Sequence, residues 1–87
     1  IFSILNIQKN DTYTIEKSEF KKTMRSLVDE LPAEQKEVLI MRMYYDMSFK
    51  EISDFTKVSI NTSLGRMRYA LINLKKMLED KNVEIPV

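Results

Sequence analysis

The chain has 87 residues, of which 44% are hydrophobic, and a net charge of +1, which suits one small domain with a modest core. It contains no cysteine and no histidine, which excludes a disulfide scaffold and a zinc site built from thiolates or imidazoles. One glycine and two prolines leave few helix breakers, so the composition favours an all-α fold.

No apolar run approaches the ~18 residues of a membrane span, so none is expected. The apolar opening, residues 1–7, has neither a basic flank nor a cleavage site, so a signal peptide is not expected either. The absence of cysteine fits a cytoplasmic location.

Charge is distributed unevenly along the chain. Residues 11–56 carry seven Lys/Arg against ten Asp/Glu, whereas residues 57–81 carry six against two. A basic C-terminal third suggests one face for an anionic partner and another face for a different partner. The alternative explanation of these basic residues is that they lie on an ordinary solvated helix surface.

The polar end of residues 1–13 suggests a linker or the remnant of a preceding region, and the missing initiator methionine suggests a fragment of a longer chain. We expect one domain at 14–81 and a tail at 82–87. The first helix is predicted to start near Thr14 or Ile15. Its amphipathic stripe consists of Phe20, Met24, Leu27, Val28 and Leu31.

Pro32 is expected to end the first helix and to open the second, which should run to about Tyr45. Residues 38–45 are apolar or aromatic at seven of eight positions. A helix that is apolar nearly all round is either central in a core or covered on its second side by a partner. The methionines at 41, 43 and 47 are expected to fill the core rather than to form a recognition groove.

Residues 48–51 (SFKE) form a predicted capping box for a short third helix that ends near Thr56, with Ile52 and Phe55 inward. Ser59 is a second predicted N-cap, opening a helix from Ile60 to about Asp80. Periodicity alone gives this helix an inward stripe of Ile60, Leu64, Met67, Leu71, Leu74 and Leu78.

A short capped helix, a tight turn and a longer helix make up the helix-turn-helix unit, whose second helix enters the major groove of DNA. Residues 48–50 stand where a phosphate contact would form, and Lys57 lies in the turn. Early in the last helix, arginine can read guanine and asparagine can read adenine. The polar candidates there are Asn61, Thr62, Ser63, Arg66, Arg68 and Tyr69. Lys75, Lys76 and Lys81 lie further downstream and are equally explained as solvated side chains.

No catalytic arrangement emerges from the sequence. Glu30, Glu34 and Glu37 cluster at a helix start rather than pairing in a pocket, and Gly65 stands alone, without a phosphate-binding loop. We therefore expect no enzyme activity, no cofactor and no metal.

Three motifs in register resemble region 4 of bacterial sigma factors of the sigma-70 family. Residues 31–39 (LPAEQKEVL) are similar to its "LP..QREVL" opening, and residues 48–53 (SFKEIS) to its "SYKEIA" step. Residues 59–71 (SINTSLGRMRYAL) are similar to its "TVKSRLxRA" recognition helix. The compact form looks most like the extracytoplasmic-function (ECF) type.

The resemblance implies an all-α fold: a small four-helix domain with a C-terminal helix-turn-helix of the winged-helix-like or sigma region 4 type, and no sheet. It implies promoter recognition in transcription initiation, with the upstream (−35) element read in the major groove of double-stranded DNA. It also implies docking on the β flap of core RNA polymerase and a possible anti-sigma factor partner. The predicted DNA-binding residues are Ser48, Lys50, Lys57, Asn61, Thr62, Leu64, Gly65, Arg66, Arg68 and Tyr69.

The family register and the periodicity disagree about Leu64. The register places Ser63, Met67, Ala70 and Leu74 inward and Leu64 toward DNA, where it can touch a thymine methyl, and we favour it. The sequence also departs from the family pattern at three positions: Gly65 removes a side chain near DNA, Lys57 replaces a turn glycine, and Ser53 replaces a small alanine. These departures concern promoter preference and turn geometry rather than the fold.

Two alternatives remain at this point. The chain could be the DNA-binding domain of an ordinary helix-turn-helix transcriptional regulator, although the opening at 31–39 and the apolar second helix are less needed there. It could also be a helical protein-interaction module that binds no nucleic acid.

Overall fold

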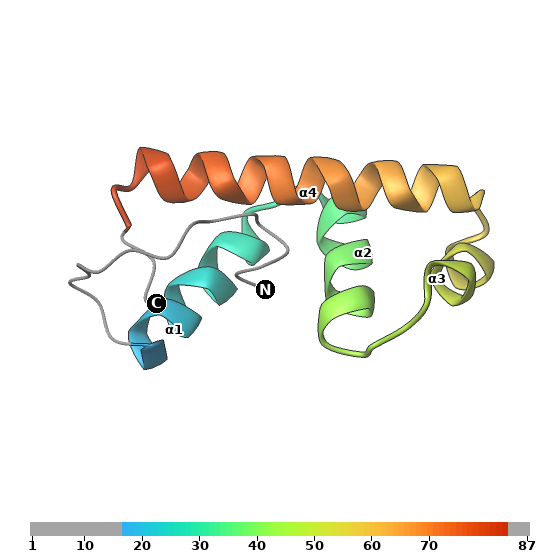
Figure 1. Cartoon of the computed structure of the whole chain (residues 1–87), viewed down its shortest axis with the longest axis horizontal. Coiled ribbons are helices and arrows are strands. Elements are labelled where there is room, and N and C mark those ends of the chain that lie inside the picture. The colour runs from blue at the N-terminus through green and yellow to red at the C-terminus, as the bar shows by residue number, and fades with distance from the viewer. Residues whose placement is uncertain (1–16, 84–87) are drawn as a thin grey trace.

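The computed structural model describes residues 17–83, which form four helices: α1 (Lys17–Asp29), α2 (Ala33–Met43), α3 (Phe49–Thr56) and α4 (Ile60–Asp80). No strand occurs in this range, so the expected all-α fold is confirmed. The start expected for the first helix, near Thr14 or Ile15, lies outside the described residues. Helix α4 runs along one side of the other three and contacts each of them, α2 most extensively (Figure 1).

A single hydrophobic core lies between α4 and the other helices. The stripe predicted for the first helix is buried throughout, from Phe20 to Leu31. The remaining buried hydrophobic residues are Val38, Leu39, Met41, Ile52, Met67, Ala70, Leu74 and Leu78. Burying a large aliphatic side chain contributes roughly 1.5–3 kcal/mol, so this one cluster is the main source of stability.

Helix α2 divides its apolar surface between the core and the solvent. Val38, Leu39 and Met41 are buried, and Met43 and Met47 pack against the core, so the methionines are core filler as expected. Pro32 is the N-cap of α2 rather than part of its first turn, because its ψ of 145° is extended. Beyond the last turn, Tyr44 and Tyr45 are exposed.

Arg42 organises the connection between α2 and α3. Its guanidinium donates to the Met47 carbonyl at 3.3 Å and to the Asp46 carboxylate at 3.4 Å. It also lies 5.6 Å from the centre of the Phe49 ring, within range of a cation–π contact. Asp46 has φ of 53°, in the left-handed region. These contacts fix where α3 begins.

The predicted capping box at the start of α3 is present. The Ser48 hydroxyl accepts from the Glu51 backbone N–H at 3.0 Å, and the Glu51 carboxylate accepts from the Ser48 N–H at 2.9 Å. Hydrogen bonding from Ser48 to the Glu51 carboxylate lowers the pKa of Glu51 below its ordinary value, with the Ser48 backbone N–H as the largest cause and the Ser48 side chain as the second. The box therefore sets the first turn of α3 and holds a carboxylate in its charged form there.

The expectation that Phe55 points inward is wrong, because its side chain is 68% exposed. Ile52 is buried as predicted, but its buried companion is Ser53. At 100° per residue the inward direction lies between residues 52, 53 and 56, which puts Phe55 on the flank. Helix α3 packs against α4 and, less extensively, against α2, and Phe55 lies outside both contacts.

The inward face of α4 consists of Ser63, Met67, Ala70, Leu74 and Leu78, all of them buried. Leu64 and Ile60 are 43% and 44% exposed, so the stripe inferred from periodicity is wrong at both positions. The inward face instead includes two small residues, Ser63 and Ala70, which a search for large apolar residues passes over. The orientation favoured for Leu64, away from the core, is confirmed.

Candidate nucleic-acid interface

The turn between α3 and α4 spans residues 57–59 and is closed by Ser53. The backbone N–H groups of Lys57 and Val58 both donate to the Ser53 carbonyl, the second at 3.2 Å. The Ser53 hydroxyl in turn donates to the Val58 carbonyl. Ser53 therefore closes the turn through both its carbonyl and its hydroxyl. Its replacement of the family's alanine did not by itself predict this role.

Lys57 adopts the left-handed conformation, with φ of 59° and ψ of 42°. Non-glycine residues seldom adopt this conformation, because Cβ approaches the following carbonyl oxygen. The replacement of a turn glycine was expected to bear on the geometry of this turn, and the structure places the strained backbone at Lys57. The turn is therefore maintained at an energetic cost.

Ser59 caps α4 through two hydrogen bonds to one residue. Its hydroxyl accepts from the Thr62 backbone N–H at 3.0 Å and lies 2.9 Å from the Thr62 hydroxyl oxygen. The cap fixes the direction of the first turn of α4 relative to α3. The hydroxyl of Ser63, next along, is fully buried and has no hydrogen-bond partner among residues 17–83.

The predicted DNA-binding residues share the outer surface of α3, the turn and the first three turns of α4. Eight of the ten are exposed: Ser48, Lys50, Lys57, Asn61, Thr62, Leu64, Arg68 and Tyr69. Gly65 and Arg66 are half-buried. A Cβ placed on Gly65 would meet nothing within 4 Å, so neither packing nor backbone conformation within the domain requires glycine here.

Some of the basic candidates have acidic partners. The Lys50 ammonium lies 3.7 Å from the Asp54 carboxylate, with both side chains exposed to solvent. The Arg66 guanidinium lies 3.7 Å from the Glu34 carboxylate at the start of α2. The second pair could not be predicted from the sequence, because its members are far apart along the chain.

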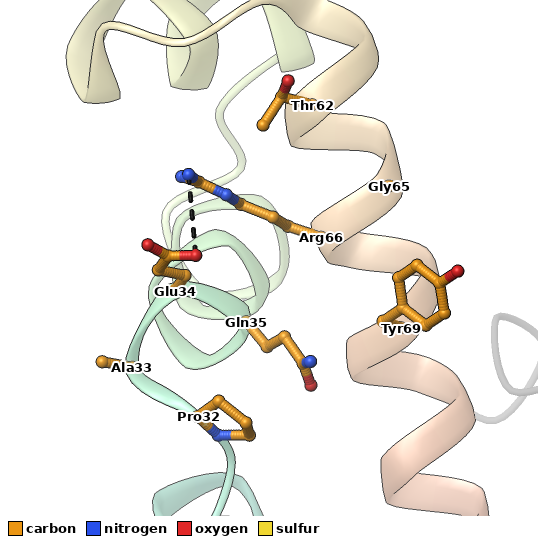
Figure 2. A pocket seen from close by; sticks show the side chains of 8 residues that line it. All are labelled: Pro32, Ala33, Glu34, Gln35, Thr62, Gly65, Arg66 and Tyr69. Atoms are coloured by element: carbon orange, nitrogen blue, oxygen red, sulfur yellow. Dashed lines mark ion pairs between the residues drawn. The ribbon is translucent and has the colours of Figure 1, made fainter.

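The start of α2 lies beside the first three turns of α4, and the two helices border a shallow hollow (Figure 2). Its lining residues are Pro32, Ala33, Glu34, Gln35, Thr62, Gly65, Arg66 and Tyr69. Just beyond it, the Asn73 amide donates to the Gln35 side-chain oxygen at 2.7 Å. The opposite flank of α4 carries an apolar and basic groove lined by Phe49, Leu64, Met67, Arg68, Leu71, Ile72 and Lys75.

Within residues 17–83, no group of three or more acidic side chains gathers as a metal ion would require. None of the helices in that range is both long and apolar enough to cross a lipid bilayer.

A short capped helix, a tight turn and a longer helix with a polar and basic outer face define a helix-turn-helix DNA-binding domain. Residues 21–70 match the family described as Sigma-70, region 4. The match covers more than half of the chain, and the chain belongs to this family. Region 4 is the part of a sigma factor that binds DNA and recognises the −35 promoter element in transcription initiation. A search of curated proteins finds no match.

Proposed function

We propose that α4 enters the major groove of the −35 element with its first three turns, and that α3 and the turn bind the flanking phosphates. The observation that carries this proposal is the alternation along α4. Ser63, Met67 and Ala70 hold the helix to the core, while the residues between them face outward or are half-buried. Such a helix is anchored on one side and free to meet DNA on the other.

The roles follow from side-chain chemistry. Arg66 and Arg68 can donate two hydrogen bonds to a guanine edge or bind phosphate, and Asn61 can pair with adenine. Leu64 offers an apolar surface to a thymine methyl. At the capped start of α3, Ser48 and Lys50 can bind a backbone phosphate, and Lys57 is placed to do so from the turn. Thr62, Gly65 and Tyr69 complete the proposed contact surface.

Replacing Arg68 tests the proposed interface. Its side chain is exposed, so Arg68→Ala should not disturb the fold but should weaken binding to promoter duplex by roughly 5- to 150-fold. Lys76→Ala is the matched control, since it removes the same charge from an exposed position two turns downstream. Affinity is measured by fluorescence anisotropy titration. If the two variants lose the same amount of affinity, or if Arg68→Ala loses none, the proposed groove contact is contradicted.

We further propose that the domain, taken as residues 14–81, belongs to a cytoplasmic sigma factor of the ECF type and docks on the β flap of RNA polymerase. The family supports an interaction with polymerase. The exposed Tyr44 and Tyr45, directly after the last residue of α2, offer an apolar surface for it. A pull-down with the isolated flap should retain the domain, and failure to do so would count against docking. An anti-sigma factor is proposed as a further partner on the family resemblance alone.

A further inference from the structure

The ion pair between Glu34 and Arg66 joins the first turn of α2 to the proposed DNA-reading face of α4. The Arg66 side chain leaves α4 and extends across the hollow toward Glu34, as the dashed line in Figure 2 shows. Its side chain is only 23% exposed, whereas that of Glu34 is 73% exposed. The arginine is therefore drawn back against the domain by a carboxylate that solvent reaches freely.

The pair stands where DNA is proposed to bind. Thr62 and Gly65 line the same hollow from the preceding turn of α4. The Arg66 Nη2 atom lies 3.7 Å from the Glu34 carboxylate, so a phosphate or guanine edge that approaches this nitrogen competes with the carboxylate for it. A displaced Glu34 would still repel the phosphates nearby.

The fold does not depend on this pair. Helices α2 and α4 are already held together by the buried core and by the hydrogen bond between Asn73 and Gln35. In the described part of the chain the Glu34 carboxylate has no partner besides Arg66. Glu34 can therefore be neutralised without removing a structural contact.

We propose that Glu34 competes with DNA for Arg66 and so lowers the affinity of the domain for DNA, as an autoinhibitory contact within the recognition surface. The inference rests on the proposed role of Arg66 in DNA binding. Exposed ion pairs are weak, so the inhibition should amount to about 2- to 5-fold in the dissociation constant at moderate salt. It should shrink as salt screens the pair.

The test is a double-mutant cycle of Glu34→Gln and Arg66→Ala in the whole chain, with the affinity for promoter duplex measured by fluorescence anisotropy. Glu37→Gln is the matched control. Glu37 is exposed, lies one turn further along α2, does not line the hollow and makes no ion pair within the described residues. It reports the general effect of removing one negative charge near DNA.

We expect Glu34→Gln to raise affinity about 2- to 5-fold, clearly more than Glu37→Gln, and to lose this excess when Arg66 is alanine. An equal gain from both glutamine variants, or a gain that persists without Arg66, would overturn the competition. A loss of affinity on Glu34→Gln would also overturn it, since Glu34 would then orient Arg66 for DNA.

The proposed function fails in a different way. If Arg66→Ala alone leaves affinity unchanged, Arg66 is not a DNA ligand, and both its proposed role and the competition are rejected. If Arg66→Ala weakens binding while Glu34→Gln behaves like Glu37→Gln, only the competition is rejected.

Discussion

Replacing Lys57 with glycine should stabilise the domain, because this lysine carries the strain of the turn between α3 and α4. Its φ of 59° and ψ of 42° place it in the left-handed region, which costs a non-glycine residue about 1–2 kcal/mol. Glycine avoids that cost but loses roughly 0.5–1 kcal/mol through its greater freedom in the unfolded chain. The net gain in the free energy of unfolding should be about 0.5–1 kcal/mol. For a domain of this size the midpoint of thermal unfolding should then rise by about 2–8 °C.

Lys57→Ala separates the backbone effect from the loss of the side chain, since alanine keeps the strain and removes the charge. Thermal and urea unfolding should place the glycine variant clearly above the alanine variant in stability. Both variants should weaken DNA binding equally and reduce its salt slope by about one unit if Lys57 binds phosphate. A glycine variant no more stable than the alanine variant would refute the argument from strain.

Two further predictions concern the inner and outer faces of α4. Gly65→Ala should stabilise α4 by about 1 kcal/mol, because the Cβ of the new alanine would meet nothing within 4 Å in the domain. The same substitution should weaken promoter binding if the α4 backbone approaches DNA closely at this position. Unchanged affinity in a titration with promoter duplex would remove Gly65 from the interface. Ser63→Ala should raise the free energy of unfolding by about 1–2 kcal/mol, because it removes a buried hydroxyl without a hydrogen-bond partner and adds a better helix former. Destabilisation in urea unfolding would mean that this hydroxyl is satisfied.

Local chemistry was sufficient to predict the four helices and their order. The capping box at Ser48 and Glu51 and the N-cap at Ser59 are determined by neighbours within one turn, so the sequence shows them directly. The stripe of α1 is also legible, because its apolar residues repeat at helical spacing and all meet one core.

Tertiary packing decided which apolar residues stay outside. Phe55 and Leu64 are both hydrophobic and both exposed. Periodicity does not separate them from Ile52 or Leu74, and only the family register turned Leu64 outward. Their exposure depends on how closely α3 and α4 approach each other, and small residues at the contact set that distance.

The sequence did not predict the ion pair that connects the candidate interface to the start of α2. The motifs placed Arg66 among the DNA-reading residues and Glu34 at a helix start, as two separate observations. The helices, their caps and the family resemblance could all be predicted from the sequence, because each depends on residues close together in the chain. Only the tertiary structure brought Glu34 to within 3.7 Å of Arg66, because the packing of α2 against α4 sets the distance between residues that lie far apart in sequence.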